Sequence, residues 1–202
     1  MNFELSAFNF QLSALDIVGA AIGLVYVFSE YRASRWFWPS SLLMAAFYAV
    51  INFRIGWYAN AGICVYNFVM SVYGLLVWRG LLVGTRRAAS AEERPIGSCS
   101  ARYWPWLLVA TAALTVAFRF ILALLGEATL PWLDGLSAAL GIVGMWMLSQ
   151  KYWQQWIFWL VSEPILVYIY LRSGYPASAV MYAVYEVFCI MGIIRWKRLS
   201  IS

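Results

Sequence analysis

The sequence predicts an all-α integral membrane protein with seven transmembrane helices. Of the 202 residues, 64% are hydrophobic and only 11% are charged, and the mean hydropathy is +0.74. Soluble domains carry about 25% charged residues, so this composition places the chain among membrane proteins. Long apolar segments predict the helices. A sequence repeat at a fixed offset divides these helices into groups of three, one and three. A single transmembrane domain over residues 1–202 is therefore expected.

Seven apolar segments account for the expected helices. They lie at about residues 15–29, 38–53, 56–78, 104–125, 134–149, 155–171 and 176–196. Several are shorter than the roughly 20 residues that span a hydrocarbon core of about 30 Å, so interfacial Trp and Tyr are expected to extend them. No Lys or Arg precedes the first segment, and such a start is not typical of a cleaved signal peptide.

A shift of 118 residues aligns the two halves of the chain without a gap. The aligned pairs are Asp16 and Asp134, Ala20-Ala21 and Ala138-Ala139, Gly23 and Gly141, Trp38 and Trp156, Arg54 and Arg172, Gly56 and Gly174, Ala59 and Ala177, Gly74 and Gly192, and Trp78 and Trp196. Small residues recur where helices pack closely, and Trp recurs at the same depth. We therefore expect two three-helix repeats, 15–78 and 134–196, joined by a linker helix at 104–125.

The linker helix determines how the two repeats are related. Three helices reverse the direction of the chain across the bilayer, so two copies joined directly would be inverted, whereas one intervening helix restores the orientation. The expected architecture is 3+1+3 with parallel repeats, SWEET-like in arrangement and related by an axis along the membrane normal. Transporters built from repeats usually bind substrate near the midplane between them, which predicts the depth of a site.

The net charge of +5 follows from membrane topology. Eleven Lys and Arg residues fall in connections on one side, namely Arg32, Arg35, Arg79, Arg86, Arg87, Arg94, Arg102, Lys151, Arg195, Lys197 and Arg198. The opposite side has Arg54 and Arg172, so the positive-inside rule predicts an outside N-terminus and a cytoplasmic C-terminus. The long basic connection at 80–103 is expected to set topology or contact anionic lipid. No nucleic-acid partner is needed to explain the charge.

A carboxylate in the middle of an apolar segment is the main candidate for function. Trp156, Trp159 and Glu163 are spaced i, i+3 and i+7, so they share one face of a helix. An ionised carboxylate near the centre of 155–171 costs about 2.5–3.5 kcal/mol on insertion scales, so Glu163 is expected to face a polar cavity or a partner. Pro164 is expected to kink or open the helix there, although the indoles alone are equally typical of an inner aromatic belt.

The apolar segments carry further polar groups, including a second acid. Glu186 and Tyr182 are spaced i, i+4 and share a face, so two carboxylates from different helices are expected to converge. An organic cation is their natural partner, since indole faces attract cations by about 0.5–2 kcal/mol; alternatively, Glu186 stays protonated and bonds to a neighbouring helix. The other polar side chains are Tyr48, Asn52, Asn60, Tyr66, Asn67, Tyr73 and Arg119. Tyr66 and Tyr73 are expected to pack rather than to bind a ligand, and Arg119 either extends outward to the membrane surface or pairs with an acid.

Catalysis has little support in the composition. The chain has no His and only three Cys, so His-based catalysis, His-containing metal sites and a disulfide framework are not expected. No arrangement of Ser and Lys points to an activated nucleophile. We expect a protein that is not an enzyme and that needs no cofactor or metal.

A structural or assembly role is the other alternative, and it predicts that removing the charge of Glu163 leaves solute uptake unchanged.

Three short motifs carry a resemblance to a known family. They are Trp57-Tyr58-Ala59, Tyr73-Gly74 with Trp78, and Lys151-Tyr152 followed by Trp156-x-x-Trp159. In order and spacing they resemble the PnuC (Pnu) family of bacterial vitamin transporters, along nearly the whole chain. The resemblance implies facilitated diffusion of a phosphate-free vitamin precursor, most often nicotinamide riboside for NAD biosynthesis, across the bacterial inner membrane. It also implies that phosphorylation inside the cell traps the substrate, and that the protein forms a homo-oligomer, a trimer.

The resemblance leads to an expected substrate site. Its residues are Trp156, Trp159, Glu163, Asn67, Tyr182 and Glu186. The indoles are expected to stack on the pyridinium ring, the carboxylate of Glu163 to oppose its charge, and the remaining groups to reach the ribose hydroxyls. The chain departs from the family pattern at Glu163, where an Asn is typical, and at Cys64, where a Gln is frequent. Because thiamine also contains a cationic ring, uptake of thiamine or another phosphate-free vitamin or nucleoside stays open.

Overall fold

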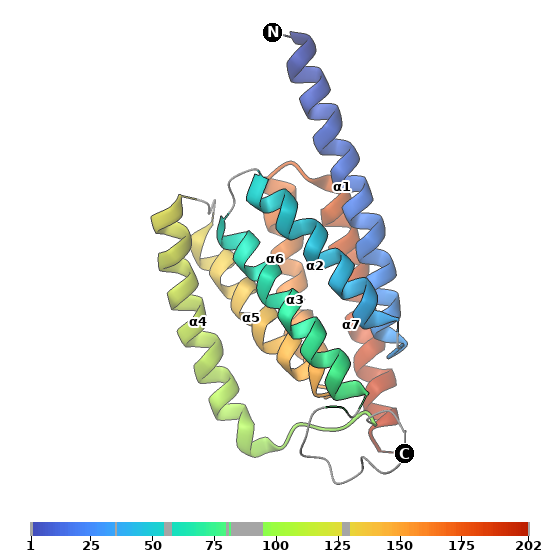
Figure 1. Cartoon of the computed structure of the whole chain (residues 1–202). Helices are drawn as coiled ribbons and strands as arrows, with labels where there is room; N and C mark the ends of the chain where they lie inside the picture. Colours follow the sequence, from blue (N-terminus) through green and yellow to red (C-terminus); the bar gives the residue numbers. More distant parts are fainter. Residues whose placement is uncertain are drawn as a thin grey trace.

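The chain folds as a bundle of α-helices. The computed structural model describes residues 2–34, 36–54, 58–79, 81, 95–126 and 130–201. In order, the elements are α1 (Asn2–Tyr31), α2 (Phe37–Arg54), α3 (Tyr58–Trp78), the 3₁₀-helix η1 (Ala101–Tyr103), α4 (Trp104–Leu125), α5 (Pro131–Ser149), α6 (Gln155–Arg172) and α7 (Pro176–Leu199). Figure 1 shows their arrangement. The predicted all-α fold with seven main helices is confirmed.

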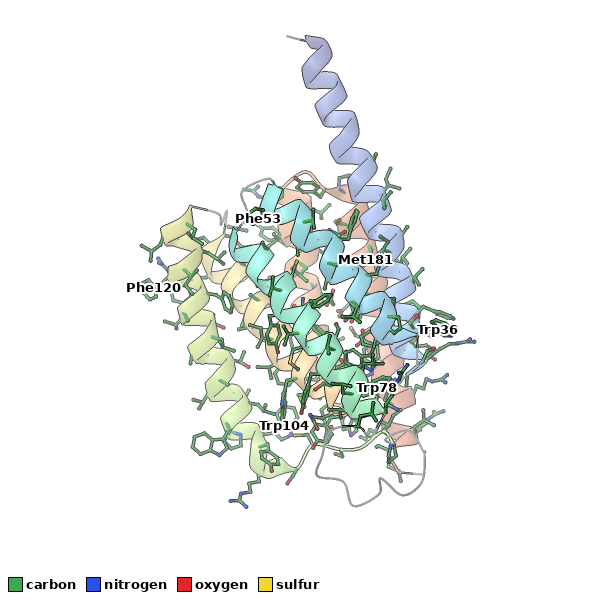
Figure 2. All side chains as sticks on the ribbon, in the orientation of Figure 1. Trp36, Phe53, Trp78, Trp104, Phe120 and Met181 are labelled. Carbon is green, nitrogen blue, oxygen red and sulfur yellow. The ribbon has the colours of Figure 1, made fainter. Side chains whose placement is uncertain are left out.

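Six of the helices pack in a closed ring, and the seventh lies outside it. Neighbours around the ring are α1–α2, α2–α3, α3–α5, α5–α6, α6–α7 and α7–α1. The remaining helix, α4, packs mainly on α5 and runs along the outer side of the bundle in Figure 1. Only Thr111 and Leu122 of α4 are buried, and Figure 2 shows Phe120 pointing away from the bundle. The interior of the ring is therefore shared by side chains from several helices.

The boundaries of α1 differ from the prediction at both ends. The segment was expected over 15–29, whereas α1 begins at Asn2 and ends at Tyr31. Its N-terminal part extends beyond the bundle in Figure 1. At the other end, Glu30 lies inside the helix and is fully buried, with its carboxylate accepting a hydrogen bond from Tyr185 of α7. A tertiary partner therefore binds one oxygen of this carboxylate, and the helix continues through Glu30 to Tyr31.

The lengths and hydropathy of the helices fit a multi-pass membrane protein. Within the described part of the chain, four helical stretches are long and apolar enough to cross a membrane: Ala61–Trp78, Ala101–Leu125, Pro131–Ser149 and Pro176–Leu199. Two shorter apolar helical stretches are Ile17–Tyr31 and Phe37–Val50. The helix α6 does not meet this criterion, because polar residues at its ends and an acid at its centre lower its hydropathy.

Two connections that the predicted repeat makes equivalent share an unusual backbone conformation. Ala33, between α1 and α2, has φ of 50°, and Lys151, between α5 and α6, has φ of 53°. Non-glycine residues rarely adopt positive φ, and among the described residues these two are the ones that do. The indole N–H groups of Trp78 and Trp196 donate to carbonyls at the ends of α5 and α1, over 3.3 and 3.1 Å. Both pairs have the 118-residue offset of the proposed repeat.

Two glycines at equivalent positions make equivalent contacts with Trp. The ring of Trp38 occupies the space where a Cβ on Gly74 would lie, and the ring of Trp156 does the same beside Gly192. Helices approach closely at such positions because glycine has no side chain. These contacts support our proposal that α1–α3 and α5–α7 are two copies of one unit. The aligned residue Gly56 and the side chains of Asp16 and Arg54 lie outside the part that the structure describes.

The last part of the long basic connection is fixed to the α5–α6 turn. Residues 80 and 82–94 lie outside the described residues, but Gly97 exchanges backbone hydrogen bonds with this turn, through Lys151 O at 2.9 Å and Trp153 N at 3.1 Å. The buried Gln154 side chain accepts from Cys99 N at 2.9 Å and donates to Ser98 Oγ at 2.6 Å. Burial raises the pKa of the Cys99 thiol, so this thiol is expected to react slowly with alkylating reagents.

Gln154→Ala is expected to lower the stability of the protein by about 1–3 kcal/mol, because it leaves the buried Cys99 N–H without an acceptor. Thermal unfolding of the detergent-solubilised protein measures this loss as a lower Tm. Ser98→Ala is the matched control, since Ser98 is exposed and its loss leaves the Cys99 hydrogen bond in place. If Gln154→Ala lowers the Tm no more than Ser98→Ala does, the hydrogen bond between Cys99 N and the Gln154 side chain does not stabilise the fold.

Candidate functional site

The helix α6 supplies both predicted tryptophans to the interior of the bundle. Trp156 is fully buried, at 0% exposure, and packs against Gly192 of α7 with the Trp196 ring 5.7 Å away between centroids. Trp159 lies against α5, where its ring is 3.1 Å from the position that a Cβ on Gly144 would take. The two indoles thus contact different neighbouring helices. The complete burial of Trp156 does not fit a belt at the membrane interface, where such rings contact lipid headgroups.

Glu163 follows the two tryptophans along the same helix and is 1% exposed. The helix α6 is continuous through Pro164, so the expected opening of the helix at this point is wrong. Pro164 itself is exposed, and it lacks the N–H that would bond to the Leu160 carbonyl. The helix thus continues with one backbone hydrogen bond missing, and the neighbouring Glu163 lies on its buried face.

Three acids from three helices lie close together inside the bundle. Glu30 of α1 and Glu186 of α7 both act electrostatically on Glu163 of α6. Among the described residues, no Lys or Arg is among the groups that act on these carboxylates. A buried cluster of like charges without a counter-charge is unfavourable. The cluster therefore favours a cation or protons as its partner.

Tyrosines surround this acidic cluster. The Tyr185 hydroxyl donates to Glu30, and the Tyr185 ring lies 6.4 Å from Trp156 and 6.3 Å from Trp159 between centroids. Tyr182 also lies within electrostatic range of Glu163. Its ring stacks on Tyr170 of α6 at 5.0 Å and 21°. Phenol and indole rings therefore line the space next to the carboxylates, and such rings stack on aromatic ligands.

Several buried polar atoms of this region have no hydrogen-bond partner among the described residues. They are Glu30 Oε1, Trp38 Nε1, Gln155 Nε2 and Oε1, Trp156 Nε1, Trp159 Nε1, Ser162 Oγ, Glu163 Oε2 and Glu186 Oε2. Buried polar groups in proteins are nearly always bonded, and each exception calls for an explanation. Most of these atoms belong to α6 or to the acids that face it. They mark this part of the ring as the candidate binding site.

The predicted residue Asn67 lies apart from the others. It is half-buried on α3, and its backbone carbonyl accepts a hydrogen bond from Ser71 Oγ at 2.7 Å. In the described residues, α3 packs along α2, α4 and α5, and it meets α7 at its last residue, Trp78, whose ring lies 6.4 Å from that of Trp196 between centroids. The structure thus brings Trp156, Trp159 and the acidic cluster together, while Asn67 belongs to the opposite wall of the ring.

Other polar residues inside the segments take packing roles. Tyr66 donates to the Ile142 carbonyl at 2.9 Å, and the Tyr73 hydroxyl accepts from Gln150 at 2.9 Å, so both link α3 to α5 or its end. Arg119 lies 5.4 Å from the Trp132 ring centroid, which is a cation–π contact. Tyr48 packs against Gly19. The side chains of Asn52 and Asn60 and the residue Trp57 lie outside the described part.

Sequence reasoning missed three members of this cluster. The first apolar segment was expected to end at residue 29, one residue before Glu30, and Gln155 is the polar first residue of the segment expected at 155–171. Tyr185 joins Glu30 from a position 155 residues away. One signal was available for Glu30, since Tyr26 and Glu30 have the same i, i+4 spacing that drew attention to Tyr182 and Glu186.

A second depression lies outside the ring, between α3, α4 and α5. It has a volume of about 370 Å³ and is lined by Gly62, Ile63, Tyr66, Phe118, Ile121 and Ile142. No carboxylate or indole contributes to this lining. Its apolar character is typical of a surface that faces lipid, and we do not include it in the candidate site.

Buried acids and aromatic rings inside a closed ring of apolar helices are typical of membrane transporters of small molecules. Comparison with known families agrees with this class. The sequence matches the family described as nicotinamide mononucleotide transporter over residues 13–198. The chain belongs to this family, and the predicted resemblance to PnuC transporters is confirmed. The family consists of transporters, which supports the expectation that the chain is not an enzyme.

Individual relatives are similar over most of their length. The chain is 26% identical to the riboflavin/roseoflavin transporter RibM of Streptomyces davaonensis, covering 90% of this chain and 83% of that protein. It is 22% identical to the nicotinamide riboside transporter PnuC of Escherichia coli, over 97% of this chain and 90% of the relative. A crystal structure of the vitamin B3 transporter PnuC has the same fold, with a TM-score of 0.74 at 20% identity over 98% of this chain and 87% of that one.

Proposed function

We propose that the protein takes up nicotinamide riboside by facilitated diffusion across the bacterial inner membrane, supplying a precursor for NAD biosynthesis. The observation that carries this proposal is the cluster of Glu30, Glu163 and Glu186 beside Trp159 and Tyr185, where no cationic side chain of the described residues acts on the acids. The pyridinium ring of nicotinamide riboside combines a positive charge with an aromatic face. Such a ring fits the cluster, and relatives named as nicotinamide riboside transporters support the same substrate.

The residues have separate roles in this proposal. Glu163 opposes the charge of the ring from the centre of α6, where low dielectric makes the attraction strong. Trp156 and Trp159 offer indole faces for stacking and cation–π contact. Tyr182 and Glu186 of α7 provide hydrogen-bonding groups for the ribose. Asn67 would contribute from α3, on the opposite wall.

Riboflavin and thiamine are the alternative substrates. A riboflavin/roseoflavin transporter is among the relatives, at 26% identity, but the isoalloxazine ring of riboflavin is uncharged and does not balance the acids. Thiamine has a cationic thiazolium ring, which meets the same charge requirement. The acidic cluster therefore favours nicotinamide riboside or thiamine over riboflavin.

The orientation and assembly of the protein are part of the proposal. Figure 1 places the C-terminus at the same end of the bundle as the end of α3 and the start of α4. In the sequence, both the C-terminal tail and the connection between these two helices are rich in Lys and Arg. The positive-inside rule makes this end cytoplasmic and the N-terminus external.

The exposed apolar face of α4, which includes Trp106 at 72% and Leu124 at 86% exposure, offers a surface for lipid or for a homotrimer interface. No cofactor is needed for facilitated diffusion.

The proposal is tested by titrating the purified protein separately with nicotinamide riboside, thiamine and riboflavin in a calorimeter. Saturable binding of nicotinamide riboside alone, together with its uptake into proteoliposomes without a pH gradient, would support the proposed function. Binding of thiamine or riboflavin alone would assign the same fold to another vitamin. Binding of none of the three would contradict a vitamin site in this cluster.

Trp159→Ala is expected to weaken nicotinamide riboside binding by about 5- to 30-fold, because a stacked aromatic contact with a cation contributes roughly 1–2 kcal/mol. Calorimetric titration measures the change in Kd. Trp106→Ala is the matched control, since Trp106 is exposed on α4 outside the ring. An equal effect of both substitutions would show that the loss does not report a contact in the site.

A further inference from the structure

Glu30 and Gln155 form a buried polar pair to which the proposed function gives no separate task. Both side chains have 0% exposure. One oxygen of Glu30 accepts from the Tyr185 hydroxyl, whereas Glu30 Oε1 has no hydrogen-bond partner among the described residues. The Gln155 amide faces this carboxylate. Neither Nε2 nor Oε1 of Gln155 completes a hydrogen bond within the described residues.

The Trp159 indole adds a further donor to this pair. Its N–H also faces the Glu30 carboxylate, and Trp159 Nε1 is buried and without a hydrogen-bond partner in the described chain. The cluster thus offers two acceptors, Glu30 Oε1 and Gln155 Oε1, beside two donors, Gln155 Nε2 and Trp159 Nε1. Buried polar groups without a hydrogen-bond partner are unfavourable. A ligand edge that carries both a donor and an acceptor would satisfy them.

We propose that Glu30 and Gln155 bind a primary carboxamide and thereby exclude the corresponding carboxylate. A carboxamide has two N–H donors and one carbonyl acceptor, so its NH₂ group donates to Glu30 Oε1 and Gln155 Oε1. Its carbonyl accepts from Gln155 Nε2 or Trp159 Nε1. This inference rests on the proposed function, because nicotinamide riboside carries such a group on its ring, and it makes Glu30 a specificity-determining residue.

The charges around Glu30 decide against a carboxylate ligand. A carboxylate has no donor for Glu30 Oε1, and it would add a negative charge beside Glu30 and Glu163, which is strongly disfavoured in a buried site. The other ionisable groups that face these two acids are Tyr26, Tyr182, Tyr185, Cys189 and Glu186. None of them is a cation. The acid form of the same ligand would therefore lack both a hydrogen bond and a counter-charge.

The test compares nicotinamide riboside with nicotinic acid riboside, two ligands that differ only in the amide and acid forms of one substituent. Calorimetric titration of the wild-type protein is expected to show that the amide form binds at least about 100-fold tighter, as sites built around buried hydrogen-bonding groups discriminate strongly. Glu30→Gln is expected to reduce this ratio below about tenfold, mainly because the acid form binds better once one repelling charge is removed. Glu30→Asp keeps the charge and is expected to retain the discrimination.

Two results would overturn the inference while the proposed function stands. In the first, the wild-type protein binds both forms equally. In the second, Glu30→Gln binds the amide form but has the wild-type ratio. If neither form binds to the wild-type protein, the proposed function fails together with the inference. Size-exclusion chromatography checks that Glu30→Gln is folded, and if it is not, the wild-type ratio decides the question.

Discussion

Glu163→Gln is expected to weaken nicotinamide riboside binding by about 10- to 100-fold while the protein stays folded. Gln has nearly the same volume as Glu, so the packing around a side chain that is 1% exposed is kept. The negative charge that would oppose the pyridinium ring is lost, and a hydrogen bond or contact to a charged group contributes about 1.5–3 kcal/mol. Calorimetric titration gives the Kd, and uptake into proteoliposomes gives the transport rate at low substrate concentration.

Two controls separate charge from shape in this experiment. Reduced dihydronicotinamide riboside keeps the size of the ligand but has an uncharged ring, so Glu163→Gln is expected to leave its affinity within about threefold of the wild-type value. Glu163→Asp keeps the charge and is expected to retain more affinity for the oxidised form than Glu163→Gln does. If Glu163→Gln weakens both forms of the ligand equally, the carboxylate acts through structure and not through its charge. Unchanged uptake would favour a protein that does not use Glu163 for transport.

The predicted residues of the site can be recognised from their spacing within one helix, whereas the missed residues come together only through contacts between helices. Trp156, Trp159 and Glu163 lie within one helix, and their i, i+3, i+7 spacing makes them visible in the sequence. Glu30 and Tyr185 meet only because α1 packs against α7, and no short-range pattern records that contact. Gln155 is polar and starts a helix, which is equally typical of a residue at the membrane surface. Its burial is a property of the ring and not of the local sequence.

The helix boundaries were predicted well where hydropathy changes sharply and poorly where it does not. The helix α4 was expected at 104–125 and is found there, since the apolar segment has Pro105 in its first turn and is followed by Gly126, which takes a left-handed conformation with φ of 67°. The first helix was expected to begin near residue 15, because residues 2–14 mix polar and apolar side chains and are too polar for a membrane span. The structure shows them as helix. Helix formation and membrane insertion are separate properties, and hydropathy reports only the second.

Gly192→Ala is expected to lower the stability of the protein by about 1–3 kcal/mol, as overpacking of a buried contact does. A Cβ at this position would overlap with the ring of Trp156, which is fully buried between α6 and α7. The ring has to move, and with it the indole face proposed to contact the substrate. The same substitution is therefore expected to weaken ligand binding as well. Thermal unfolding and calorimetric titration of one preparation measure both effects.

Alanine substitutions at two glycines of α3 show whether this effect is specific to Gly192. Gly62→Ala on α3 meets no atom within 4 Å, so it is expected to leave Tm unchanged or to raise it slightly, since Ala is favoured over Gly in a helix by about 0.5–1 kcal/mol. Gly74→Ala is expected to behave like Gly192→Ala in stability, because the Trp38 ring fills the equivalent space. It should affect ligand binding less, since Trp38 lies on α2 and not on α6. Equal loss of binding in both variants would instead assign Trp38 and Trp156 equivalent roles around one central site.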